Sequence, residues 1–343
     1  MFHYAILANP GHNRIYFDTA LHIACAELTA MLGAENITVK DVGEREVGLP
    51  AAICFSTSTP LDDRAQTLLS ASSIYYALFE LLPDGLMRPL TPAPYNSFPE
   101  SMSQILRYIG KTNEQFTRLM LNLALSACGT NTAKKTLIDP MCGKGTTLYE
   151  GLILGLDVVG VEINAKWVQE IQTFIVKYLK TGKYKHKAKK EKRTGEAGKK
   201  LADCFVVETA ADKQAYNSGE IQTMKVMAAD TRIADKLVKK NSCDIMVSDL
   251  PYGVQHGSKN AKETKMNRSP LTLLEEALPA WRQMLRPQGA IVLSFNEFTL
   301  KWTDLADTLQ QAGFHVLSEA PYVGYLHRVD QSINRNLIVA VKA

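Results

Sequence analysis

Five short apolar segments, separated by longer stretches of helical character, dominate the second half of the chain. The segments that we predict as strands are residues 136–138, 158–161, 225–228, 245–247 and 290–294. Helices are expected between them, for example at residues 165–178 and 271–285, and strands that alternate with helices form parallel, doubly wound sheets. A hairpin of residues 314–318 and 336–341 is expected to close the sheet. The sequence therefore predicts an α/β, Rossmann-like domain with a seven-stranded, mostly parallel sheet.

The first eighty residues alternate in another order. The patterns predict strand, helix, strand, strand, helix and strand, at residues 4–8, 13–32, 37–42, 51–55, 60–70 and 74–82, although residues 75–81 could also be helical. This βαββαβ order is that of the split ferredoxin-like unit. Five prolines then fall in residues 83–99, which excludes a regular helix or a central strand there. We expect a small ferredoxin-like α+β domain at 1–82, a proline-rich linker at 83–100 and the larger domain, opened by a helix at 101–125, at 101–343.

Acidic residues end the first three strands of the larger domain, at Asp139, Glu162 and Asp230. In an open α/β sheet, ligands bind beyond the carboxyl ends of the strands. Gly143 and Gly145 follow the first strand, where glycine lets backbone N–H groups approach a ligand closely and the next helix N-terminus favours an anion. Glu162 lies about twenty residues after Asp139, the separation expected for an acid that accepts from ribose hydroxyls. Asp230 could accept from an adenine amino group, although the acids could also simply cap helices.

Three acids and one glycine loop suit an adenosyl ligand with a carboxylate tail, which indicates S-adenosylmethionine. The dinucleotide pattern G-x-G-x-x-G is absent, and the loop lacks the Walker spacing. The candidate cofactor residues are Asp139, Pro140, Cys142, Gly143, Gly145, Thr146, Thr147, Glu162, Ile163, Asp230 and Thr231.

The fourth strand ends in Asp249, Leu250, Pro251 and Tyr252, which are the candidate catalytic residues. In a sheet of the usual order this motif lies across the cofactor pocket from the glycine loop. An exocyclic amine on a base is a poor nucleophile, and the Asp249 carboxylate and the Leu250 carbonyl could each accept one of its N–H groups. Positioning and fixed dipoles would then provide most of the rate gain. Pro251 stiffens the backbone, and Tyr252 could stack on the base. Whether Asp249 is a base or only an acceptor stays open.

The net charge of +4 is unevenly distributed, because residues 177–200 alone carry eleven basic residues and two glutamates. This segment is either a flexible, solvated insertion or an arm that binds a phosphate backbone. Six scattered cysteines signal neither a disulfide framework nor a zinc site, so no metal is expected. We also find no membrane-spanning run and no targeting segment, and we expect a cytoplasmic protein.

Three motifs carry a resemblance to a known family. D-P-M-C-G-K-G-T at 139–146, G-V-E-I-N at 160–164 and S-D-L-P-Y-G at 248–253 together resemble the methylase domain of guanosine-N2 tRNA methyltransferases that usually carry a THUMP domain. The resemblance implies the class I S-adenosylmethionine-dependent fold and methyl transfer to the N2 amine of a guanosine, with tRNA as the partner. It also implies that residues 112–117, with Phe116 and Thr117, touch the methionine end of the cofactor, and that residues 325–330 and Arg335 form a closing hairpin loop.

The chain departs from this family in two ways. Leu250 replaces the first proline of the usual D-P-P-Y motif, although its carbonyl remains available. Residues 83–99 are too few to contain a THUMP domain, so we hypothesise that the basic insertion at residues 180–200 substitutes for it. The candidate RNA-binding residues are Lys183, Lys185, Lys187, Lys189, Lys190, Arg328 and Arg335.

Two other readings remain open at this point. A DNA amino-methyltransferase acting on adenine N6 or cytosine N4 shares the carboxylate–proline–aromatic chemistry. An RNA-binding protein could keep a vestigial methyltransferase fold, although Asp139, Glu162 and Asp249 argue for activity. The sequence indicates neither the RNA and nucleotide nor the oligomeric state, and an activating protein partner is possible but not signalled.

Overall fold

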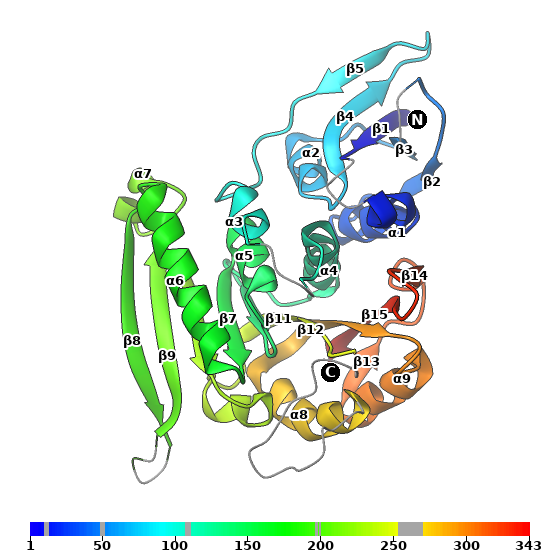
Figure 1. The fold of residues 1–343 in the computed structure, drawn as a ribbon. Helices are drawn as coiled ribbons and strands as arrows, with labels where there is room; N and C mark the ends of the chain where they lie inside the picture. The colour runs from blue at the N-terminus through cyan, green and yellow to red at the C-terminus, as the bar shows by residue number, and fades with distance from the viewer. Residues whose placement is uncertain (10–13, 49–51, 107–110, 196–197, 199, 253–269) are drawn as a thin grey trace.

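The protein is organised around two sheets in a computed structural model that describes residues 1–343 except 10–13, 49–51, 107–110, 196–197, 199 and 253–269 (Figure 1). Five strands of the larger sheet are parallel: β6 (Thr136–Asp139), β7 (Asp157–Glu162), β10 (Gln222–Ala228), β11 (Cys243–Asp249) and β12 (Leu285–Asn296). β15 (Asn334–Lys342) pairs antiparallel with β12 and with β13 (Phe314–Val316). The order β10-β7-β6-β11-β12-β15-β13 is the seven-stranded, Rossmann-like arrangement that the sequence predicts.

The described sheet is wider than this prediction, because it has ten strands rather than seven. β9 (Lys200–Thr209) pairs antiparallel with β10, and β8 (His186–Thr194) pairs antiparallel with β9 at the edge. β14 (His327–Arg328) pairs with β15. The basic insertion is therefore largely a β-hairpin that extends the sheet, and the flexible reading is wrong for residues 186–194. An edge strand tolerates a row of lysines because one side of it faces solvent.

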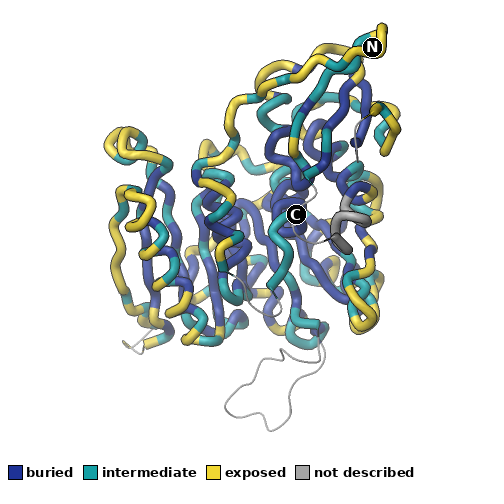
Figure 2. The backbone as a smooth tube through the Cα atoms, turned by 45° about the horizontal axis from the view of Figure 1, so that its top comes forward, coloured by how far each residue is buried: buried dark blue, intermediate teal, exposed yellow. Residues whose placement is uncertain are grey.

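Helices cover both faces of the larger sheet (Figures 1 and 2). One apolar core lies beneath α4 (Glu114–Ala127), α5 (Thr146–Ile153) and α6 (Ala165–Thr181). The other lies beneath η2 (Thr231–Lys236), α8 (Pro270–Met284) and α9 (Trp302–Gln311). α6 illustrates the sequence cause: Val168, Ile171, Ile175 and Leu179 recur at helical spacing and are its buried residues. A short helix, α7 (Lys213–Ser218), joins β9 to β10.

The helix predicted at 101–125 is two helices. α3 (Ser101–Gln104) ends early, and α4 begins after Asn113, whose side chain accepts a hydrogen bond from the Phe116 amide at 3.0 Å. An asparagine N-cap satisfies a helix-end amide and so fixes where a helix starts. The cap places Thr112 and Phe116 beside the catalytic strand end.

The N-terminal unit contains β1 (Phe2–Ala8), α1 (Arg14–Ala34), β2 (Val39–Glu44), β3 (Ala52–Thr57), α2 (Asp63–Ser70), β4 (Tyr75–Leu81) and β5 (Met87–Leu90). Its sheet order is β2-β3-β1-β4-β5 with antiparallel neighbours, and the first four strands have the ferredoxin-like order. β5 lies inside the segment predicted as a linker, so that prediction is wrong for residues 87–90. Pro89 is tolerated because β5 is an edge strand.

A buried polar cluster joins the two units. Glu27 of α1 accepts hydrogen bonds from the Ser73 amide at 2.9 Å and from Asn122 of α4 at 2.6 Å. Burial raises the pKa of Glu27, and both Glu27 and Asn122 are almost fully buried. The N-terminal unit is thereby fixed to the helix that borders the candidate active site. None of the helices in the described part of the chain is long and apolar enough to cross a membrane.

Candidate active site

The glycine loop between β6 and α5 is tightly folded. The Gly145 amide donates to the Cys142 carbonyl at 2.7 Å, and Gly143 and Gly145 have φ values of 52° and 90°. Residues other than glycine rarely adopt this left-handed conformation, which explains both glycines. Thr146 and Thr147 begin α5, as predicted for a loop that leads into a helix N-terminus. Pro140 and Cys142 are buried behind the loop.

Two acidic side chains flank this loop. Asp139 accepts from the Met141 amide at 3.1 Å and from Ser248 Oγ at 2.9 Å, while Glu162 accepts from the Gly143 amide at 2.9 Å and the Asn164 amide at 2.8 Å. Burial raises the pKa of Asp139 to about 6 and that of Glu162 to about 7. The Ile163 amide also stabilises the Glu162 carboxylate. Three backbone donors leave part of the acceptor capacity of its two oxygens for a hydroxyl donor.

The surroundings of Glu162 fit the predicted adenosyl ligand. Ile163 follows it and is 44% exposed, which leaves an apolar surface beside the two acceptor oxygens. An apolar face next to a convergent pair of acceptors is what a ribose with a flat base requires. The groups of Asp139, Gly143, Glu162 and Ile163 are therefore compatible with S-adenosylmethionine, although their roles remain predictions.

Asp230 is already engaged. It caps η2 and accepts from the Arg232 amide at 2.9 Å and from Arg232 Nη2 at 2.7 Å, and Arg232 also contacts Glu276 at 2.6 Å. Burial raises the pKa of Asp230, but the hydrogen bonds and charge of Arg232 outweigh it and leave the pKa low. This geometry favours the helix-cap reading over acceptance from adenine. Thr231 is buried and accepts from Trp281 Nε1 at 2.8 Å.

Asp249 lies at the end of β11, next to β6, and hydroxyl groups hold it from two sides. Thr112 Oγ1 donates to Asp249 Oδ2 at 2.7 Å, and the Tyr252 hydroxyl donates to Asp249 Oδ1 at 2.6 Å. Thr112 was not among the predicted site residues. Its only sequence signal is its place at the start of the motif at 112–117. Asp249 is thus fixed between α4 and its own loop, and Asp139 lies within electrostatic range.

Leu250 has a structural reason to replace proline. Its amide donates to the Ser294 carbonyl at 2.8 Å, and its side chain is buried in the core beneath α8. A proline at this position lacks the N–H that makes this bond. Pro251 follows as a partly buried residue.

The Tyr252 side chain, which the sequence predicts to stack on a base, contacts Asp249 and Arg335 in the structure. Its hydroxyl accepts from Arg335 Nε at 2.8 Å while it donates to Asp249, and burial raises its pKa. The Arg335 guanidinium lies 4.6 Å from the ring centroid of Phe116 and 5.6 Å from that of Tyr252. Arg335 is only 7% exposed. The prediction that it binds RNA directly is therefore replaced by an internal role, the positioning of Tyr252.

His327 is a further residue that the sequence reasoning did not single out. Its ring packs edge-on against Phe116 with 5.2 Å between centroids, and burial lowers its pKa to about 4, so it is neutral near pH 7. Phe116 and Thr117 are themselves fully buried in the first turn of α4. Gly253 and His256 lie outside the described residues. In the described chain, no cluster of three or more His, Cys, Asp or Glu residues could hold a metal ion.

The remaining RNA-binding candidates lie elsewhere. Lys187, Lys189 and Lys190 are on β8, and Lys183 and Lys185 precede it. β8 is five strands from β11 in the sheet, or roughly 24 Å at about 4.8 Å per strand. Arg328 is exposed and donates to the carbonyls of Asp330 and Gln331. The structure therefore keeps the lysines apart from Asp249, whereas Arg328 lies on β14, next to the strand that carries Arg335.

Comparison with known proteins gives one family match and several distant structural ones. Residues 90–301, more than half of the chain, match the family model described as "RMKL-like, methyltransferase domain". No curated protein sequence matches.

Solved structures resemble the chain only distantly. A TehB-like SAM-dependent methyltransferase from Corynebacterium glutamicum is 13% identical, with 62% of this chain and 83% of that chain covered, at a TM-score of 0.35. An rRNA methylase from Streptococcus thermophilus is 10% identical, with 68% and 99% covered, at a TM-score of 0.36. Similarity at this level does not identify a substrate.

Proposed function

The chain belongs to the RMKL-like methyltransferase domain family, and from that premise we propose that it methylates the exocyclic N2 amine of a guanosine in RNA, with tRNA as the substrate class. S-adenosylmethionine is the expected donor. The observation that carries the proposal is the Asp249 carboxylate, held at the end of β11 by Thr112 and Tyr252. Its neighbouring strand, β6, ends in the acid and glycine loop of the cofactor pocket.

The cofactor pocket has the groups that this donor needs. Glu162 would accept from the ribose hydroxyls, Ile163 would contact the adenine, and the backbone of Gly143 and Gly145 would approach the methionine end. When bound, S-adenosylmethionine supplies an electrophilic methyl group on a sulfonium. Asp139 stabilises the loop through the Met141 amide.

The acceptor side depends on Asp249 and the Leu250 carbonyl. Each would accept one N–H of the base amine, which orients the nitrogen lone pair toward the donor. The bond from the Leu250 amide to the Ser294 carbonyl fixes the peptide between Asp249 and Leu250, which directly precedes the peptide that carries this carbonyl. The Thr112 and Tyr252 hydroxyls keep the Asp249 carboxylate oriented for this contact.

Asp249 can accept an amine beside the donors that it already holds. Each of its oxygens accepts one hydroxyl hydrogen bond, and a carboxylate oxygen has a second lone pair for another donor. The substrate N–H would therefore bind beside the Tyr252 hydroxyl, which keeps Asp249 oriented while the Tyr252 ring contacts the base.

The choice of RNA over DNA is supported by the three motifs shared with the guanosine-N2 enzymes and by the lysine-rich hairpin. Among the described residues, no contact favours the DNA alternative. The vestigial alternative is opposed by the hydrogen-bonded arrangement of Asp139, Glu162 and Asp249. We expect labelled methyl groups from S-adenosylmethionine to enter tRNA transcripts and not duplex DNA of equal length. Transfer to DNA alone would overturn the proposal.

A further inference from the structure

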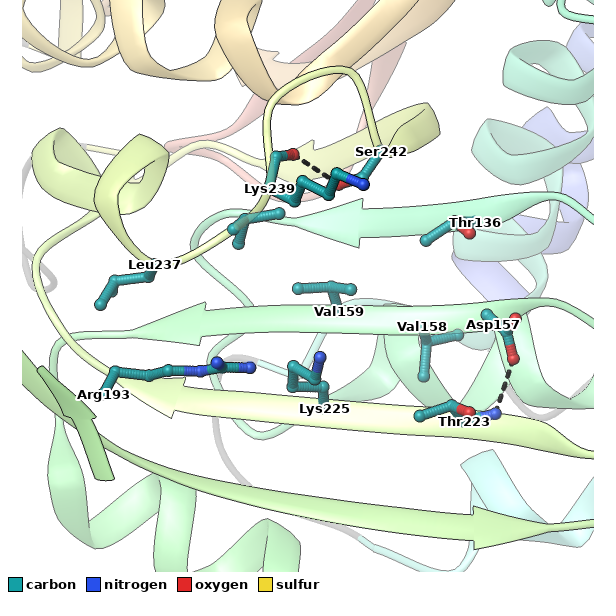
Figure 3. A pocket seen from close by; sticks show the side chains of 11 residues that line it. Thr136, Asp157, Val158, Val159, Arg193, Thr223, Lys225, Leu237, Lys239 and Ser242 are labelled. Carbon is teal, nitrogen blue, oxygen red and sulfur yellow. Dashed lines mark hydrogen bonds between the residues drawn. The ribbon is translucent and has the colours of Figure 1, made fainter. Parts of the chain in front are cut away.

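A cavity of about 320 Å³ lies on the larger sheet, away from the candidate active site (Figure 3). Three cationic side chains line it from three elements: Arg193 of β8, Lys225 of β10 and Lys239 of the loop after η2. Figure 3 shows Arg193 extending along the sheet toward Lys225, with Leu237 and Lys239 above them. The floor is apolar where Val158 and Val159 contribute.

The cavity exists because this face of the sheet is incompletely covered. The connection from β10 to β11 contains only the six-residue 3₁₀ helix η2, whose following loop covers part of the sheet with Leu237 and Val238. On the other face, α6 packs over the same strands along 17 residues. A lysine in an interior strand, such as Lys225, is tolerated because the covering layer stops short of it.

β8 continues the positive charge. Successive side chains on a strand point to opposite faces, so Lys187 and Lys189 share a face with Arg193, whereas Lys190 and Lys192 share the other. The cross-strand partner of Lys189 is Val206, which packs in the core on the cavity side, and that of Lys190 is Phe205, which packs beneath α6. Alternate residues are about 6.6 Å apart, a spacing comparable with the step between phosphates of an extended nucleic-acid strand.

Acidic groups only partly neutralise this surface. Glu191 contacts Lys189 at 2.7 Å and Arg193 at 3.8 Å. Asp157 is paired with Lys134 at 2.7 Å and accepts from the Thr223 amide at 2.6 Å. Glu208 lies across from Lys187. In the described part of this face the cations Lys187, Lys189, Arg193, Lys225 and Lys239 still outnumber the acids.

The row of cations on β8 runs toward the edge of the sheet at which Asp249 lies. Asp203 of β9 pairs with Ala228 on one side and with Lys192 on the other, so the end of β8 is level with the end of β10. β8 therefore runs in the same direction as the parallel strands, whose ends carry the cofactor acids.

We propose that the cavity and the adjoining face of β8 bind the sugar–phosphate backbone of the substrate RNA, away from the nucleotide that is methylated. The inference rests on the proposed function, because it takes RNA as the substrate. Cations that neutralise phosphates release condensed counterions, so binding through this surface depends steeply on salt.

Two double variants of equal charge change test the surface. R193Q/K225Q removes cations from the cavity, and K177Q/K192Q removes one from α6 and one from the opposite face of β8. With a tRNA transcript at low salt, R193Q/K225Q should raise Kd by roughly tenfold and flatten the slope of log Kd against log salt by about 1 to 2 units. K177Q/K192Q should change Kd by less than about twofold. Equal weakening by both variants, or no weakening by the first, would overturn the proposal.

A gain of affinity provides the reciprocal test. Glu191→Gln removes the carboxylate between Lys189 and Arg193 and should tighten RNA binding, by about threefold. Weaker binding would contradict the inference, as would an acidic polyglutamate peptide that binds as tightly as RNA.

Calorimetric titration with S-adenosylmethionine should be unchanged in each variant, which checks folding. If the wild type transfers no methyl to RNA but R193Q/K225Q weakens RNA binding, the proposed function is refuted and the inference about this surface stands. If the wild type methylates RNA but R193Q/K225Q binds RNA with unaltered affinity, the inference is refuted and the proposed function stands.

Discussion

Asp249 and Tyr252 form a connected unit rather than two independent groups. The Tyr252 hydroxyl donates to Asp249 at 2.6 Å and accepts from Arg335 at 2.8 Å, and Thr112 supports the other carboxylate oxygen. Arg335 and Asp249 are therefore connected by two hydrogen bonds that share the Tyr252 hydroxyl. Residues that act through one another in this way show non-additive effects when they are mutated.

Tyr252→Phe separates the two roles of this side chain. The ring that would stack on the base is retained, but the donor to Asp249 and the acceptor for Arg335 are lost. We expect kcat to fall by roughly 10- to 100-fold with little change in KM for RNA, since a hydrogen bond to a charged group contributes about 1.5–3 kcal/mol. Steady-state kinetics on tRNA transcripts measure this effect. An unchanged kcat in Tyr252→Phe, together with loss of activity in Tyr252→Ala, would assign Tyr252 to stacking alone.

The two cofactor acids predict a pH dependence of donor binding. Burial raises the pKa of Glu162 to about 7 and that of Asp139 to about 6. Below these values the carboxyls are protonated, and Glu162 is then a poorer acceptor for ribose hydroxyls. The affinity for S-adenosylmethionine should therefore rise between pH 6 and pH 8, and calorimetry should show a weaker pH dependence in Glu162→Gln, in which only Asp139 still titrates.

The same shifts have the opposite sign for stability. A carboxyl whose pKa is raised by folding stabilises the protein fully at pH values below its unfolded pKa, and this contribution is lost as the pH rises through the folded value. Thermal unfolding without ligand should therefore show these two acids favouring the fold at pH 5 more than at pH 8. A donor affinity that falls with rising pH would contradict the role given to Glu162.

At the scale of elements, the end of β11 explains why a leucine stands in the catalytic motif. Leu250→Pro restores the motif of the resembling family, but it removes the amide bond to Ser294 and replaces a buried leucine side chain. We expect a loss of stability of about 2–4 kcal/mol from the lost bond and the cavity. Chemical denaturation measures it, with Leu250→Met as the matched control that keeps the amide. A Leu250→Pro protein as stable as the wild type would show that the peptide is not fixed in this way.

The elements also show what the sequence could and could not predict. The five parallel strands could be predicted from short apolar runs. The roles of Asp139, Glu162 and Asp249 could be predicted because each is an acid at the carboxyl end of such a run. β8 was missed because a row of lysines is typical of solvated segments, and only its pairing with β9 makes it a strand. The sequence predicts α3 and α4 as one helix because apolar residues recur at helical spacing on both sides of Asn113. In the structure the Asn113 cap starts α4 as a separate helix.

Side-chain contacts between distant segments could not be predicted. Thr112 and Asp249 are 137 residues apart, and Tyr252 and Arg335 are 83 apart. Neither spacing nor residue type indicates that Arg335 is buried, or that Arg232 donates hydrogen bonds to the Asp230 carboxylate. Such pairings depend on how the whole sheet brings its ends together.

At the scale of the molecule, the Glu27 cluster couples the ferredoxin-like unit to α4. Asn122→Leu removes the donor to Glu27 and should destabilise the protein by about 1–3 kcal/mol. Burial already raises the pKa of Glu27, so the cost should be smaller at acid pH, where the carboxyl is protonated. Thermal unfolding at two pH values tests this, and Asp307→Asn on the exposed surface of α9 is a control. An equal loss of stability at both pH values would contradict the ionisation argument.

The whole molecule thus combines a methyltransferase sheet, a fixed N-terminal unit and a basic edge hairpin around one carboxylate. The most direct test is mass spectrometry of nucleosides from tRNA transcripts incubated with the protein and isotopically labelled S-adenosylmethionine. The account predicts labelled N2-methylguanosine with the wild type and at least about 100-fold less with Asp249→Asn, whose affinity for S-adenosylmethionine should stay within about twofold. Label in another nucleoside, or undiminished N2-methylguanosine with Asp249→Asn, would contradict it.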